Sequence, residues 1–293
     1  SMQNNPQNEE RLSPWWKNGV FLVLIAGFSV LIWLAVKSYQ DAPPIPDQIR
    51  NEQGDILFTG DDIRSGQEIF LRQGLMNNGT VWGHGAYLGP DFSTSYLYHQ
   101  TNDAYELLAK QKYQKSWSDL NEEQKEGIRE NVAKDSRVNR YDPSTGVLTL
   151  SAAEAYSYEQ QQAVWRKFFS EPHQNFGLPE KYIDDAEELR LLTAFFFWTS
   201  WASVTNRPGK EFSYTNNFPY APAVNNVPTH GTLLWSALSL IALLGGTGLA
   251  LFVFGRFDFL GWQQKDHLHP QLLPGEASTG QKAVLKYFVI AAL

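Results

Sequence analysis

GTLLWSALSLIALLGGTGLALFVF, residues 231–254, decides which class of protein the sequence encodes. The stretch carries no charged side chain, and it is long enough to cross a bilayer as a helix, which takes about 20 apolar residues. Residues 211–230 before it contain no lysine or arginine, whereas Arg256 and Lys265 follow it. Cytoplasmic loops carry the excess of positive charge. The sequence therefore predicts a transmembrane helix that delivers the chain to the cytoplasm.

A second uncharged run, VFLVLIAGFSVLIWLAV at residues 20–36, lies near the N-terminus. Two tryptophans and a lysine precede it and Lys37 follows it, as is typical of helix ends at a membrane surface. A cleaved signal peptide would have a shorter apolar region and a small-residue cleavage site, so we favour an uncleaved anchor. With two spans, both ends are predicted in the cytoplasm and residues 38–230 on the other side of the membrane.

A third apolar run starts at residue 283 and continues to the last residue. Because a chain rarely ends inside a hydrophobic run, we expect the sequence to be the N-terminal piece of a longer multi-pass membrane protein in contact with lipid. The predicted order is a cytoplasmic N-terminus at 1–18, a transmembrane helix at 19–37, a periplasmic domain at 38–230, a second transmembrane helix at 231–254, a cytoplasmic loop at 255–282 and the start of a third transmembrane helix at 283–293.

Composition excludes several kinds of chemistry. The formal net charge of -7 argues against a nucleic-acid partner, which usually requires a basic surface. The absence of cysteine excludes disulfides, thiolate catalysis and cysteine-ligated zinc or iron–sulfur sites. No pairing of a nucleophile with a base is evident, so we expect no catalytic residue in this sequence.

The predicted periplasmic domain reads as mostly helical. A proline-rich linker at 41–47 leads to a helix that Asp61 and Asp62 are expected to cap and Gly74 to end. A loop is expected over 75–95. Capping signals start further helices at Asn121, Ser151 and Asp184–Asp185, and a turn at 142–146 precedes a short strand at 147–150.

The last of these helices contains LLTAFFFWTSWASV, residues 191–204. The run is too short to span a bilayer, so it is interpreted as a buried core helix rather than an interfacial one. The stretch that follows is rich in proline, asparagine and tyrosine, and it predicts an irregular segment leading to the second span.

A helix, a tight glycine loop and an aromatic C-terminal helix resemble the plan of a small cytochrome c. GTVWGHGAYLGPD, residues 79–91, resembles the segment after the haem-attachment motif in the cytochrome c subunit of bacterial nitric oxide reductases. Aligned on Gly85-Ala86-Tyr87, the two haem cysteines fall on Leu75 and Asn78, and the haem histidine on Gly79. The resemblance therefore implies a cytochrome c-like domain without haem c.

WTSWASVTNRPG at 198–209 and YTNNFP at 214–219 resemble the same family, as does the order of spans, so that the likeness covers about residues 38–293. The pattern is similar to quinol-dependent nitric oxide reductases, in which the cytochrome-like part is fused to the catalytic part and binds no haem. Such enzymes reduce nitric oxide to N2O in denitrification with electrons from quinol. The resemblance implies two haems b and a non-haem iron bound beyond residue 293.

The resemblance also implies a metal site in the glycine loop. In the family a calcium ion lies between haem propionates, and this loop supplies oxygen ligands; carried over, these are Gly85, through its carbonyl, and Tyr87. Calcium accepts backbone carbonyls among its 6–8 oxygen ligands. The alternative is that the loop only packs. Solvent-exposed or hydrogen-bonded roles are expected for His84 and His99, and a solvated loop for His267 and His269.

Two other interpretations of the whole chain stay open at this point. Two spans around a periplasmic domain are also the plan of chemoreceptors and sensor kinases, although a charged helical linker would then follow the second span. A nitric oxide dismutase would look nearly the same. Small residues at Ala242, Gly246 and Ala250 share one helix face, which predicts a close helix contact. The partner is either another helix of the same protomer or the same helix of a second one, in a homodimer through residues 231–254.

Overall fold

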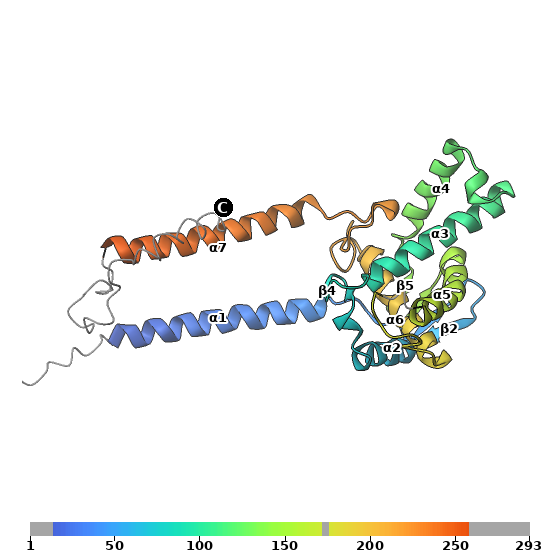
Figure 1. Cartoon of the computed structure of the whole chain (residues 1–293). Coiled ribbons are helices and arrows are strands. Elements are labelled where there is room, and N and C mark those ends of the chain that lie inside the picture. The colour runs from blue at the N-terminus through green and yellow to red at the C-terminus, as the bar shows by residue number, and fades with distance from the viewer. Residues whose placement is uncertain (1–13, 172–175, 258–293) are drawn as a thin grey trace, which may run out of the picture. The chain divides into compact units, whose positions relative to one another are not determined.

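The computed structural model describes residues 14–171 and 176–257 and divides the chain into two units at Thr229/His230. Two of its helices are long and apolar enough to cross a membrane: α1 (Pro14–Gln40) and α7 (His230–Phe257), both unbroken in Figure 1. They contain the two predicted spans. The predicted loop at 255–282, with His267 and His269, lies almost wholly outside the described residues, as does the run from 283.

The small residues Ala242, Gly246 and Ala250 were predicted to form a close contact with another helix. A methyl group added at Gly246 would meet no atom within 4 Å, so this face of α7 is open in the structure. The homodimer contact stays a prediction.

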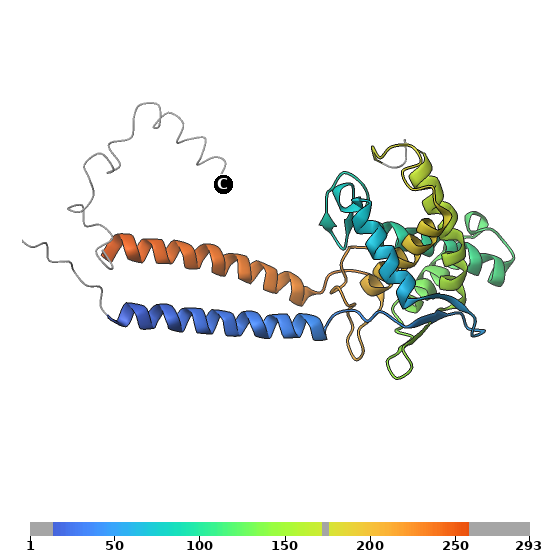
Figure 2. The ribbon, with the colours of Figure 1, turned by 90° about the horizontal axis from the view of Figure 1, so that it is seen from below.

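Between these helices in the sequence, the chain folds into a mostly helical domain with a small sheet at its periphery (Figures 1 and 2). Its helices are α2 (Gly60–Arg72), α3 (Phe92–Tyr113), α4 (Glu122–Asp135), α5 (Ala152–Ser170) and α6 (Ala186–Val204), with 3-10 turns at Leu75–Asn77, Trp117–Asp119 and Pro222–Val224. Its strands are β1 (Gln48–Arg50), β2 (Ile56–Thr59), β3 (Thr80–Val81), β4 (His84–Gly85), β5 (Tyr141–Asp142) and β6 (Val147–Thr149).

The predicted short strand at 147–150 belongs to a four-stranded sheet that the sequence did not otherwise indicate. The order is β2-β1-β6-β5, with β1 parallel to β6 and the two outer pairs antiparallel. These strands have two to four residues, too few for the alternation of apolar and polar side chains to be recognised. The sheet packs on the main core through the side chains of Ile49, Phe58 and Leu148.

The crossing of α2 over α6 organises the main core. Gly66 on α2 lies against the backbone of α6, where an added methyl group would overlap the Leu191 carbonyl and lie 2.8 Å from Cβ of Phe195. Ile63, Ile69 and Phe70, on the predicted apolar face of α2, are buried beside it. The absence of a side chain at Gly66 therefore sets how closely the two helices approach.

Aromatic rings fill the space between α3, α5 and α6. Phe196 of α6 stacks on Phe92 of α3 with ring centroids 4.9 Å apart, and Trp165 of α5 lies 4.6 Å from Phe196. All three side chains are at most 1% exposed. The buried-core interpretation of residues 191–204 is thus confirmed, since every residue from Leu192 to Val204 is buried.

A smaller second core joins α4 to the segment 206–227, which we call the strap. It contains Tyr105 of α3, Ile128 and Val132 of α4, Val204 at the end of α6 and Val224 of the strap. The irregular course predicted for residues 212–229 is confirmed, apart from the single 3-10 turn at Pro222–Val224. The helix before it ends at Val204, which is earlier than the Arg-Pro-Gly signal at 207–209 indicated.

Helix starts were predicted well, with two corrections. Asn121, Ser151 and Asp185 cap α4, α5 and α6 as expected. The cap of α2 is Thr59, not Asp61 or Asp62: the Thr59 side chain accepts from the Asp62 backbone, and the Asp62 carboxylate accepts from Thr59 N. The expected loop over 75–95 ends early, because Asp91 caps α3, whose irregular apolar pattern gave no helical signal.

Glu154, in the capping box of α5, is buried, and burial raises its pKa to about 7; the Ser151 N–H and the Arg140 guanidinium oppose that rise. A carboxyl whose pKa is higher in the folded than in the unfolded chain binds more protons when folded, so stability falls as pH rises from about 4.5 to about 7. We expect Glu154→Gln to match the parent at about pH 4, below the unfolded pKa, and to exceed it by about 3 kcal/mol at about pH 8. Urea unfolding at both pH values checks this, and an equal difference at both would contradict it.

Candidate functional site: the hairpin loop after α2

The glycine loop that the sequence singled out forms a tight hairpin after α2. Gly74 takes a left-handed conformation and ends the helix as predicted, and a 3-10 turn follows. β3 and β4 then pair antiparallel, with Val81 opposite His84. The two connecting residues, Trp82 and Gly83, both have positive φ (52° and 75°), which is typical of the two-residue turns that match strand twist.

Asp91 holds this hairpin to the start of α3. Its Oδ2 accepts hydrogen bonds from Thr80 Oγ1 and Gly83 N, both at 2.8 Å. Its Oδ1 accepts from the backbone and the hydroxyl of Thr94 in the first turn of α3. One carboxylate therefore fixes the hairpin tip and caps the helix at the same time.

Trp82 ties the hairpin to the core. Its indole N–H donates to the carbonyl of Thr199 on α6 at 2.8 Å, and its ring lies 5.5 Å from that of Trp198. The Trp198 indole in turn donates to the carbonyl of Pro44 in the linker after α1. The hairpin, α6 and the linker are thus linked through two tryptophans. The sequence analysis assigned no role to Trp82, Trp198 or Asp91. These residues appeared there only as members of the motifs at 79–91 and 198–209.

The three positions aligned with the haem-binding residues do not fit a covalent haem. Leu75 is fully buried in the main core, and the Asn78 amide donates to the carbonyl of Phe176. A side chain at Gly79 would overlap the Pro90 carbonyl and lie 2.7 Å from the Phe92 ring. Without cysteine no thioether can form, and position 79 has no room for a histidine without moving its neighbours.

Gly85 and Tyr87, the predicted calcium ligands, lie on the exposed side of the hairpin. The Tyr87 side chain is 85% exposed, and its hydroxyl donates to the carbonyl of Gly83 at 3.0 Å. The nearest carboxylate in the hairpin, Asp91, already accepts four hydrogen bonds. Among the described residues no three His, Cys, Asp or Glu side chains gather to hold a metal. The calcium site at Gly85 and Tyr87 stays a prediction.

The two histidines of this region lie apart from any such cluster. His84 is exposed on β4. His99 on α3 is partly buried, and burial lowers its pKa while Asp103 opposes the shift. Asp103 accepts a hydrogen bond from the buried Ser157 hydroxyl at 2.6 Å.

A comparison with known families assigns the domain. The family model for the cytochrome c-like domain of the nitric oxide reductase protein NorB matches residues 46–220, which is more than half of the chain. The chain belongs to the NorB family of nitric oxide reductases. No curated protein matches the sequence.

Family membership places the hairpin loop in a cytochrome c-like domain. The match begins just before β1 and ends inside the strap, so it includes the sheet, the hairpin and α2 to α6. It also removes the basis for the sensor interpretation, which rested only on the order of the two spans. The NorB-type chain thus carries a cytochrome c-like domain together with two helices suited to a membrane.

Proposed function

We propose that the chain is the N-terminal part of a quinol-dependent nitric oxide reductase of the bacterial inner membrane, with residues 38–230 in the periplasm. The observation that carries this is the hairpin: a member of this family whose haem-binding positions are Leu75, Asn78 and a crowded Gly79 has no haem c through which to receive electrons. Quinol, a lipid-soluble donor, can reach the catalytic part through the membrane instead.

The proposed reaction converts two NO and a quinol to N2O, water and quinone. Two haems b and a non-haem iron would supply that chemistry, and their ligands would come from other parts of the enzyme. The role left for the described domain is structural. It covers the catalytic part and supplies the exposed face of the hairpin loop as a contact, with Gly85 and Tyr87 contributing oxygens to a calcium ion there.

Two adjacent side chains support a contact role for this loop. Tyr87 and Leu88 are 85% and 71% exposed, although the loop backbone is held by hydrogen bonds to the core. A rigid loop that presents large apolar side chains to solvent is typical of a surface that another polypeptide covers.

We expect Tyr87→Ala to lower nitric oxide reduction and bound calcium by about ten-fold in the full-length enzyme, while membrane insertion is unchanged, because metal ligands and their supports typically contribute this much. Reductase assays and metal analysis of the purified enzyme measure both. Tyr98→Ala is the matched control, since Tyr98 is also exposed but lies on α3 outside the loop. Parental activity and calcium in the Tyr87 variant would show that the loop only packs.

A further inference from the structure

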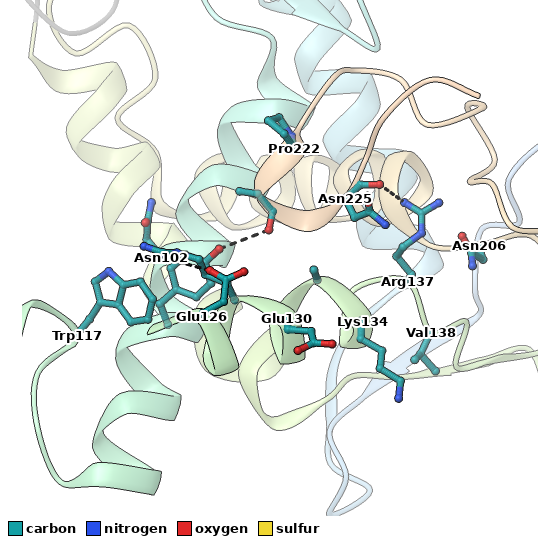
Figure 3. Close-up of a pocket in the computed structure, with 14 residues that line it drawn as sticks. Asn102, Trp117, Glu126, Glu130, Lys134, Arg137, Val138, Asn206, Pro222 and Asn225 are labelled. Carbon is teal, nitrogen blue, oxygen red and sulfur yellow. Dashed lines mark hydrogen bonds and ion pairs between the residues drawn. The ribbon is translucent and has the colours of Figure 1, made fainter. Parts of the chain in front are cut away.

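A groove of about 1000 Å³ opens between α4 and the strap, away from the hairpin loop (Figure 3). This is the upper end of the ~300–1000 Å³ range of ligand pockets. Trp117 and Glu126 lie at one end, and Arg137 and Asn206 at the other (Figure 3). The charged side chains that line it are three cations and two carboxylates: Arg129, Lys134, Arg137, Glu126 and Glu130.

The charges are matched at the first end and not at the second. Glu126 forms an ion pair with Arg129 at 3.1 Å. Within residues 14–171 and 176–257, neither Lys134 nor Arg137 forms an ion pair. Glu130 lies one helical turn from Lys134, but the two side chains are not paired. The Arg137 end therefore keeps an uncompensated positive charge.

Arg137 is partly buried, and its bonded acceptors are all neutral. The guanidinium donates to the carbonyls of Asn225 and Glu211 at 3.1 Å and to the Asn217 side chain at 2.8 Å. These are three hydrogen bonds from a group with five N–H donors. Burial lowers the pKa of Arg137, and no carboxylate opposes that shift. A desolvated cation without a counter-charge is costly, so the site favours an anion.

A second unsatisfied group lies beside it. The Oδ1 atom of Asn206 is buried without a hydrogen-bond partner in the described chain, and Asn206 lines the same end of the groove. Its backbone N–H donates to the Arg137 carbonyl at 3.1 Å, which fixes the two residues next to each other. Buried polar atoms are nearly always paired. This oxygen only accepts hydrogen bonds, so it would pair with a donor such as a headgroup hydroxyl and not with a phosphate oxygen.

The same end of the groove is connected to the membrane end of α1. Arg207, the neighbour of Asn206, lies 3.8 Å from the carboxylate of Asp41, which directly follows α1. Because α1 is long and apolar enough to span a bilayer, its end lies near the lipid headgroups. An anion held in the membrane surface near the end of α1 would be a lipid phosphate.

We propose that the Arg137 end of this groove binds a phosphate group, and that its source is the headgroup of an anionic phospholipid. Guanidinium groups are well suited to phosphate, and Lys134 at the rim supplies a second charge. The site does not depend on the reductase reaction. It would hold the strap against the membrane surface.

The test is native mass spectrometry of the full-length protein with phosphatidylglycerol or phosphatidylcholine added, and with inorganic phosphate as competitor. We expect retention of phosphatidylglycerol over phosphatidylcholine. Removing one charge, in Arg137→Gln or Lys134→Gln, is expected to lower that retention about five-fold. Lys134→Gln tests the site without a risk of misfolding, because the Lys134 side chain makes no hydrogen bond or ion pair in the described chain. Lys115→Gln, an exposed lysine outside the groove, is the charge-matched control.

Three outcomes would overturn the proposal. Equal retention of the two lipids would remove the headgroup preference. Retention in Lys134→Gln and Arg137→Gln equal to that in Lys115→Gln would place the lipid elsewhere. Full displacement of phosphatidylglycerol by an equal concentration of inorganic phosphate would assign the site to free phosphate and not to lipid.

Discussion

Gly66→Ala is expected to destabilise the cytochrome c-like domain by about 3–4 kcal/mol. The added carbon would overlap the Leu191 carbonyl and press on Cβ of Phe195, and neither is the flexible end of a side chain. Only a separation of α2 from α6 would relieve the overlap, and that separation opens the main core. Chemical denaturation of the purified protein measures the loss.

Gly127→Ala provides the matched control. Gly127 lies in the interior of α4, where an added methyl group would meet nothing within 4 Å. Alanine is favoured over glycine in a helix interior by about 1 kcal/mol, so this variant should be slightly more stable than the parent. If the two variants changed stability equally, the close approach of α2 to α6 would not be what Gly66 provides.

The sequence predicted the helical elements where their ends carry strong chemical signals. Asn121 and Ser151 were recognised because a capping side chain three residues before a glutamate or glutamine is a local pattern. Asp184 and Asp185 were recognised as acidic residues before an apolar run. The two long apolar helices were recognised by their length, their lack of charged residues and the residues that flank them. The burial of residues 191–204 followed from a run too short for a bilayer and too apolar for a surface.

What the sequence could not show depends on contacts between distant segments. The parallel pairing of β1 with β6 joins residues that are about a hundred positions apart in the chain, and neither strand is long enough to have a pattern. α3 was missed because its buried residues include serine, threonine and glutamine. The functions of Asp91, Trp82 and Arg137 depend on partners on other elements, and none of these contacts has a signature in the local sequence.

The glycine loop was singled out by its resemblance to a known family, and the structure shows how its residues pack. Gly79 was expected to replace a haem ligand, and the structure adds that the Pro90 carbonyl and the Phe92 ring close the position to any larger side chain. The stacked rings of Phe92 and Phe196 continue this packing into the core. The position aligned with the haem histidine is therefore enclosed by neighbouring residues of the domain.

The central claim is that quinol, and not cytochrome c, donates the electrons. The choice of donor should decide whether N2O forms at all. Membranes that contain the full-length polypeptide as their only nitric oxide reductase should form N2O from NO when a quinol is supplied, with no cytochrome c present. The cytochrome c-like domain should carry no covalently bound haem after denaturation, because residues 1–293 contain no cysteine to form the thioether. The measurement is N2O formation with quinol and, separately, with reduced cytochrome c. N2O with quinol alone is the predicted result; N2O only with reduced cytochrome c, or oxygen release in place of N2O, would contradict the account.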